Sequence, residues 1–162
     1  MSDQNDQNIS VSKTVDASPE AVFAVLSAPS RHQQFDSADM LRGTDTAAIN
    51  GAGDEFVMKM NNNTLGDYEM RNVVTEFEPN RKITWAPSLH PLDGYTDKVG
   101  GLQATGHTYS WELLPDGDGT KVTQTYDWSG VTDQAFVKTF PLLSQEQLSD
   151  SIDKLVQAAK RH

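Results

Sequence analysis

Apolar and polar residues alternate along much of this chain, and the alternation is clearest between His107 and Trp128. Bulky residues there fall at every second position on both sides of a central turn, which is the spacing of side chains on one face of a strand. The turn segment, Pro115-Asp-Gly-Asp-Gly119, supplies residues that tolerate a chain reversal. The pattern predicts a β-hairpin with a polar face and a bulky face. The residues on the bulky face are Tyr109, Trp111, Leu113, Val122, Gln124, Tyr126 and Trp128.

Shorter alternating runs, separated by turn residues, predict five further strands. The third of these strands has a clearer alternation than the second, and its Phe56, Met58 and Met60 share one face. We expect Pro87 to end the fifth strand, because proline lacks the N–H that a sheet ladder uses. The predicted strands cover residues 9–15, about 40–49, 55–60, 68–77 and 82–85.

Two short helical segments are expected after the first strand. Ser18 has the character of an N-cap and is followed by Pro19, which favours the first helical position, so a helix should run from there to about residue 28. A second helical turn is expected over residues 30–35. From Phe140 onward, apolar residues recur at spacings near three and four, which predicts a long amphipathic C-terminal helix of about twenty residues.

A sheet and a helix that each have one apolar face must cover one another. The order of elements therefore predicts an α+β helix-grip fold: a curved antiparallel sheet of about seven strands wrapped around the C-terminal helix, with two short helices after strand 1. Residues 1–8 are expected to form a disordered polar tail, and residues 9–162 a single domain. A chain of this length can bury a sizeable core.

The amino-acid composition disfavours several classes of function. The 23 acidic residues outnumber the 13 basic ones, giving a formal charge of −10, which disfavours nucleic acid as a partner. No cysteine is present, so disulfides and thiolate chemistry are excluded. No apolar run reaches the roughly 20 residues of a membrane span, and the start of the chain lacks a signal-peptide pattern. We expect a cytoplasmic protein without stable membrane insertion, and the pattern leaves its oligomeric state open.

Several segments occur in an order that resembles the START-like or Bet v 1-like superfamily, and within it the bacterial polyketide cyclase/dehydrase and lipid-transport-like proteins. The segments are Val15-Asp-Ala-Ser-Pro-Glu-Ala-Val-Phe-Ala-Val-Leu26, Ile83-Thr-Trp-Ala-Pro87, Gly119-Thr-Lys-Val-Thr123, Tyr126-Asp-Trp-Ser-Gly130 and the final helix. Members of the superfamily include aromatase-cyclases, hydrolases, lipid carriers, hormone receptors and chaperone regulators, so the shared fold does not select a function. Where many relatives carry Trp-Asp or Trp-His, this chain has Phe35-Asp36, and we interpret Phe35 as the replacement aromatic residue.

Candidates for acid–base chemistry are few. His107 shares the inward register of the hairpin, so it is either an acid or base at a cavity mouth or a solvated residue at the loop end. Asp36 either reaches the cavity edge or caps a helical turn. Tyr126 is the third candidate for proton transfer. The four histidines show no metal-ligand spacing, so no metal and no cofactor are expected.

The inward aromatic and sulfur side chains either fill a core or line a cavity. We expect a cavity between the sheet and the C-terminal helix, because a curved sheet around one helix leaves an apolar hollow of the kind that binds small molecules. Trp111 and Tyr126 are expected to meet beneath the helix. The predicted ligand-binding residues are Phe35, Phe56, Met58, Met60, Trp85, Tyr109, Trp111, Tyr126, Trp128, Leu148 and Ile152.

These patterns favour a soluble binding protein for a hydrophobic small molecule such as a lipid, a polyketide-like compound or an aromatic metabolite. One alternative is a polyketide cyclase or dehydratase that acts in the same cavity. Another is a protein-interaction module related to the chaperone regulators. The glycine-rich segment from Pro87 to Gly106 is predicted to be a mobile gate of the cavity.

Overall fold

The computed structural model of the chain describes residues 7–36, 41–44, 48–62, 66–89, 105–138 and 144–160. Its seven strands form one antiparallel sheet in the order β1-β7-β6-β5-β4-β3-β2. The elements in chain order are β1 (Asn8–Val15), α1 (Pro19–Leu26), the 3-10 helix η1 (Pro29–Phe35), β2 (Leu41–Thr44), β3 (Glu55–Asn62), β4 (Gly66–Glu78), β5 (Lys82–Leu89), β6 (Thr108–Asp116), β7 (Gly119–Asp127), α3 (Gln134–Val137) and α4 (Gln145–Lys160).

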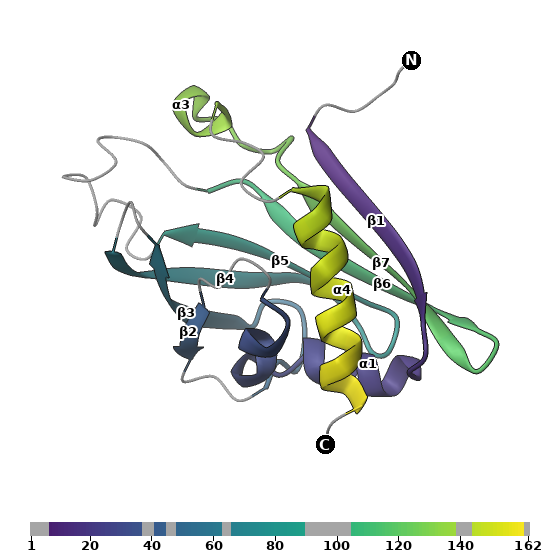
Figure 1. The fold of residues 1–162 in the computed structure, drawn as a ribbon. Coiled ribbons are helices and arrows are strands. Elements are labelled where there is room, and N and C mark those ends of the chain that lie inside the picture. The colour runs from purple at the N-terminus through teal and green to yellow at the C-terminus, as the bar shows by residue number, and fades with distance from the viewer. Residues whose placement is uncertain are drawn as a thin grey trace, which may run out of the picture.

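The long helix α4 lies across one face of the curved sheet, with α1 and η1 beside its C-terminal half (Figure 1). The helix turns one apolar stripe toward the sheet, as its sequence period requires. The α+β helix-grip prediction is confirmed, including the two short helices after β1. The buried residues of α4 are Leu148, Ser151, Ile152, Leu155, Val156, Ala158 and Ala159.

The β6–β7 hairpin has the predicted register. Tyr109 pairs with Tyr126 and Trp111 pairs with Gln124, so all four side chains are on the inner face. The turn between the strands contains Gly117, whose φ of 60° lies in the left-handed region that glycine adopts readily. The outer face instead carries hydroxyl pairs across strands, including Ser10–Thr125 at 3.1 Å, Ser12–Thr123 at 2.7 Å and Thr84–Ser110 at 3.0 Å.

Each of the two short helices is fixed by a specific hydrogen bond. The Ser18 hydroxyl accepts a hydrogen bond from the Ala21 N–H at 3.1 Å, and Pro19 occupies the first turn of α1, as predicted. In η1, the Arg31 guanidinium donates to the Ala158 carbonyl near the end of α4 at 2.7 Å. A cation at that position satisfies a terminal carbonyl of the helix. This contact fixes η1 against α4.

The core divides into two groups of buried side chains. The first joins α1, η1 and the C-terminal half of α4 to the sheet, and includes Trp111 and Ile152. We call the second group the Tyr126 cluster; it consists of Tyr68, Leu89, Tyr126, Trp128, Val131, Phe136 and Leu148.

The prediction that Pro87 ends its strand is wrong. Strand β5 continues to Leu89, and Pro87 lies opposite Asn72 of β4. Within the described part of the chain, β6 pairs with β5 only as far as Trp85. Pro87 therefore occupies a segment with one described neighbouring strand, and proline is tolerated in such edge positions.

Three further elements differ from the sequence prediction. The second strand is shorter, with β2 ending at Thr44. Helix α3 was not predicted; the Asp133 carboxylate caps it by accepting from the N–H groups of Ala135 and Phe136. Helix α4 has 16 residues and begins at Gln145. Phe140, Leu143 and most of the predicted gate over residues 87–106 lie outside the described residues.

Candidate functional site

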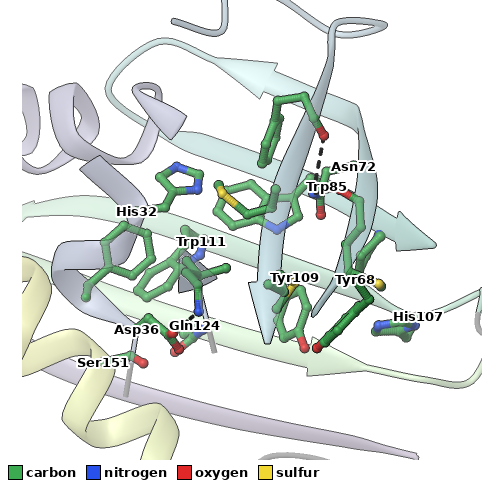
Figure 2. Close-up of a pocket in the computed structure, with 17 residues that line it drawn as sticks. His32, Asp36, Tyr68, Asn72, Trp85, His107, Tyr109, Trp111, Gln124 and Ser151 are labelled. Carbon is green, nitrogen blue, oxygen red and sulfur yellow. Dashed lines mark hydrogen bonds between the residues drawn. The ribbon is translucent and has the colours of Figure 1, made fainter. Parts of the chain in front are cut away.

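A cavity of about 180 Å³ lies between the inner face of the sheet, η1 and α4 (Figure 2). Six strands, the 3-10 helix and the long helix contribute to its wall, and most of the contributing side chains are apolar. The lining residues are His32, Phe35, Asp36, Leu41, Phe56, Met58, Met60, Tyr68, Met70, Asn72, Trp85, Pro87, His107, Tyr109, Trp111, Gln124 and Ser151.

Strands β3 and β4 supply a wall rich in sulfur. Met58 lies opposite Met70, and Met60 lies opposite Tyr68 in the antiparallel register. Directly opposed residues point to the same face of a sheet, so these four side chains converge on the cavity. Methionine is unbranched and polarizable, which lets such a wall adapt to occupants of different shape.

His32 closes the cavity at the η1 end. Its imidazole stacks on Trp85, with ring centroids 5.0 Å apart and planes inclined by 23°. The Nε2 atom lies 2.7 Å from the Leu26 carbonyl oxygen, and because that oxygen only accepts, Nε2 carries the proton. Burial lowers the pKa of His32 to about 4, despite the opposing effect of this hydrogen bond. At neutral pH the ring is uncharged, with Nδ1 as its remaining acceptor.

His107 is also uncharged at neutral pH, because burial lowers its pKa to about 4. Only 2% of the residue is exposed. Its ring lies edge-on to Tyr109 at 5.8 Å and to Phe136 at 5.5 Å. Of the two alternatives raised by the sequence, the solvated loop position is therefore wrong.

The tyrosines form the wall beside His107. The rings of Tyr109 and Tyr126 stack with centroids 4.9 Å apart, and the hydroxyl ends of Tyr109 and Tyr68 point toward one another in Figure 2. Burial raises the pKa of Tyr109 well above its ordinary value, and the neighbouring Tyr126 hydroxyl raises it further. The phenol of Tyr109 therefore stays protonated across the physiological range.

Two polar side chains in the wall are held by backbone groups. Asn72 donates from Nδ2 to the carbonyl oxygens of Phe56 and Met70, at 3.3 Å and 3.2 Å. Asp36 accepts from the Leu41 N–H through Oδ2 at 2.7 Å. The cap-like role considered for Asp36 is thus present, and the residue lines the cavity as well.

The predicted ligand-binding residues separate into two sets. Seven of them line the cavity: Phe35, Phe56, Met58, Met60, Trp85, Tyr109 and Trp111. The other four are buried in the core: Tyr126, Trp128, Leu148 and Ile152. Of the acid–base candidates, His107 and Asp36 line the cavity, whereas Tyr126 is fully buried and stacks on Tyr109.

Several wall residues were not among the predicted ligand-binding or acid–base residues: His32, Leu41, Tyr68, Met70, Asn72, Pro87, Gln124 and Ser151. Gln124 had a detectable signal, since it is a polar residue at an inward position of an otherwise bulky register. Tyr68 and Met70 have the same parity along β4, but that strand shows no clear alternation.

Within the described part of the chain, no three His, Asp or Glu side chains gather as metal ligands would, and no helix is long and apolar enough to cross a membrane.

The sequence model of the polyketide cyclase / dehydrase and lipid transport family matches residues 6–160. The chain belongs to this family. The chain is similar in sequence to the uncharacterised protein Rv0088 of Mycobacterium tuberculosis (strain ATCC 25618 / H37Rv), with 32% identity over 124 residues. The match covers 73% of this chain and 47% of Rv0088, so the family member described here spans about half the length of that relative.

Solved structures share the fold at low sequence identity. Protein CV1439 of Chromobacterium violaceum superposes with a TM-score of 0.66 at 14% identity, over 96% of this chain and 99% of that one. The Aha1 dimer of Colwellia psychrerythraea gives a TM-score of 0.58 at 17% identity, over 95% and 96%. These similarities extend the fold assignment to most of the chain.

Proposed function

We propose that this member of the polyketide cyclase and lipid transport family binds a hydrophobic small molecule, such as a lipid, a polyketide-like compound or an aromatic metabolite, in the cavity beneath α4. The observation that carries the proposal is the cavity itself, about 180 Å³ in volume and lined mainly by aromatic and methionine side chains. Apolar cavities with a few placed polar groups are the usual form of small-molecule sites.

The arrangement of the wall supports this function over a simple packing defect. The wall combines firmly held aromatic groups, such as the His32–Trp85 stack, with adaptable methionines on β3 and β4. A binding site needs both features, because preformed rings reduce the entropy cost of binding and flexible side chains fit the occupant.

The test combines ligand detection with a blocked cavity. Protein purified from its own host is extracted with organic solvent for mass spectrometry, and the unfolding temperature is measured with a panel of apolar compounds. A binder raises that temperature in proportion to ln(1 + [L]/Kd). Met58→Trp fills the cavity and should abolish the shift. The matched control is Val57→Trp, the neighbouring position on the other sheet face, which should retain the shift.

An absence of any extracted compound, together with unmoved unfolding temperatures across the panel, would contradict the proposal. If a compound still raises the unfolding temperature of Met58→Trp, it binds at a site other than this cavity.

A second candidate is an enzyme of the cyclase or dehydratase type. It is favoured by one observation: a neutral imidazole, His107, and a protonated phenol, Tyr109, lie side by side in the cavity wall. A neutral imidazole accepts a proton and a phenol donates one. Turnover of a poly-β-keto or enone substrate that is lost in His107→Gln, with ligand affinity retained, would favour this candidate over simple binding.

The chaperone-regulator alternative has less support. Among the residues that the structure describes, Leu114 is the large hydrophobic residue that is exposed, with 52% of its surface accessible. The outer face of the sheet carries hydroxyl pairs such as Ser12–Thr123. A protein-docking surface is expected to present a larger apolar patch.

A further inference from the structure

Trp111 and Gln124 form a polar pair in the cavity wall. They lie directly opposite each other on β6 and β7, and both line the cavity. Only 1% of Trp111 and 4% of Gln124 are exposed to solvent. Figure 2 shows both side chains in the wall on the sheet side of the cavity.

Within the described part of the chain, neither the Trp111 Nε1 atom nor the Gln124 Oε1 atom has a hydrogen-bond partner. The indole N–H can only donate, and the amide oxygen can only accept. Buried polar groups without partners destabilise the folded state, so nearly all such groups in proteins are paired. Both residues line the cavity, so a bound molecule that reaches these two buried atoms supplies the missing donor and acceptor.

The charge of the wall restricts what that molecule can be. Among the lining residues that the structure describes, none is Lys or Arg, and the two histidines, His32 and His107, are neutral because burial lowers the pKa of each. Asp36 adds an acidic group. A carboxylate or phosphate head group would therefore lose its hydration without gaining a cation, which is unfavourable.

We infer that the Trp111–Gln124 pair binds the hydroxyl group of a neutral, ring-sized ligand, that is, a phenol or a cyclic alcohol. The ligand oxygen accepts from the Trp111 indole, and its O–H donates to the Gln124 amide oxygen. A cavity of about 150 Å³ accommodates benzene, so the present volume of about 180 Å³ suits a molecule of one or two rings. The inference rests on the proposed function and specifies its ligand class.

The experiment uses three probes with the same two-ring skeleton: 2-naphthol, naphthalene and 2-naphthoate, titrated at neutral pH. For the wild-type chain, 2-naphthol should bind about tenfold more tightly than naphthalene, because a hydrogen bond to an otherwise unpaired buried group gains on the order of that factor. Binding of 2-naphthoate should be the weakest of the three.

Two variants remove one polar group each: Gln124→Met, which keeps a similar volume, and Trp111→Phe, which keeps an aromatic ring of smaller size. In both, the preference for 2-naphthol over naphthalene should fall by about five- to tenfold, whereas the affinity for naphthalene stays within about twofold of wild type. The matched control is Thr125→Val, on the outer face of the same strand, where the hydroxyl contacts Ser10. It should preserve the wild-type preference. Unfolding temperatures identify a variant that fails to fold. If one of Gln124→Met and Trp111→Phe fails, the probe affinities of the other still test the inference.

The possible outcomes distinguish a failure of this inference from a failure of the proposed function. If 2-naphthol and naphthalene bind equally well in the wild type, or if the preference survives in a folded variant, the pair does not bind a hydroxyl, although the cavity still takes apolar molecules. If 2-naphthoate binds tightest, the neutral-ligand class is wrong. If none of the three probes binds, both the inference and the proposed function fail for ring compounds.

Discussion

Tyr109 and Tyr126 lie opposite each other on β6 and β7, and their rings stack with centroids 4.9 Å apart and planes inclined by 6°. Tyr109 faces the cavity, whereas Tyr126 is fully buried with Leu148 and Trp128 in the Tyr126 cluster. The stack therefore joins the cavity wall to the core beneath the start of α4. A change at either ring acts on both stability and the shape of the site.

Removing the Tyr126 hydroxyl should cost less than removing core volume. Tyr126→Phe loses a buried interaction with the Tyr109 hydroxyl, which is worth about 1 kcal/mol. Leu155→Ala deletes a fully buried side chain of α4 and should cost about 3 kcal/mol. Urea denaturation of both variants measures the difference. Equal losses would mean that Tyr126 stabilises the fold through its hydroxyl as much as Leu155 does through packing.

The buried histidines should make the fold sensitive to mild acid. The pKa values of His32 and His107 are lowered to about 4, below their ordinary value of 6.5. As pH falls from 6.5 toward 4, the unfolded chain takes up protons that the folded chain does not, so stability decreases by up to about 1.4 kcal/mol per pH unit for each histidine. Well above pH 6.5, where the unfolded imidazoles are also neutral, neither residue contributes a pH dependence.

The free energy of unfolding, measured by urea denaturation between pH 7 and pH 5, tests this expectation. In His32→Gln and His107→Gln the decrease should be shallower than in the wild type, and in the double variant shallower again. Parallel curves for wild type and the double variant would show that the two imidazoles have the same pKa in the folded and the unfolded chain, which contradicts the lowered values.

Gly119 should not tolerate a side chain. A Cβ atom at this position would overlap the Val15 carbonyl oxygen, where β7 pairs with β1. We expect Gly119→Ala to cost about 1 to 3 kcal/mol or more, because backbone must move to relieve the overlap. Gly117→Asn, in the same turn, is the matched control: it meets open space at a φ of 60°, which asparagine tolerates. Similar thermal stability of the two variants would contradict the predicted clash.

The ion pair between β1 and α4 should contribute little to stability. Lys13 Nζ lies 2.7 Å from Asp153 Oδ1, but 35% of the lysine side chain and 59% of the aspartate side chain are exposed. Solvent screening limits such pairs to below about 1 kcal/mol. Lys13→Met should therefore change the unfolding free energy much less than Leu148→Ala, expected at about 3 kcal/mol. A larger effect at Lys13 would indicate that its contact with Ser149, at 3.2 Å, also matters.

The hairpin was predictable because alternation fixes the face on which a side chain lies. Trp111, Tyr109 and Tyr126 are all on the inner face, as their parity requires. Parity does not give the distance of a side chain from the cavity along the strand. Tyr126 and Trp128 share the register of the wall residues but pack in the core, because the cavity lies nearer to η1 and β3.

The role of His32 was not predictable from periodicity. It lies in a 3-10 helix of seven residues, and such a segment has no extended apolar stripe to indicate which side chains point inward. Pro87 shows a second limit of local patterns. Its compatibility with β5 depends on how far β6 extends alongside, which is a property of the assembled sheet.

The hydrogen bond from His32 to Leu26 links the size of the cavity to the integrity of a helix. Leu26 is the last residue of α1, and its carbonyl oxygen belongs to the terminal set that has no partner within the helix. A ligand large enough to displace the imidazole would leave that oxygen buried without a donor. Helix capping thus sets an upper size limit for occupants on this side, and a variant that caps α1 by another route would admit bulkier molecules.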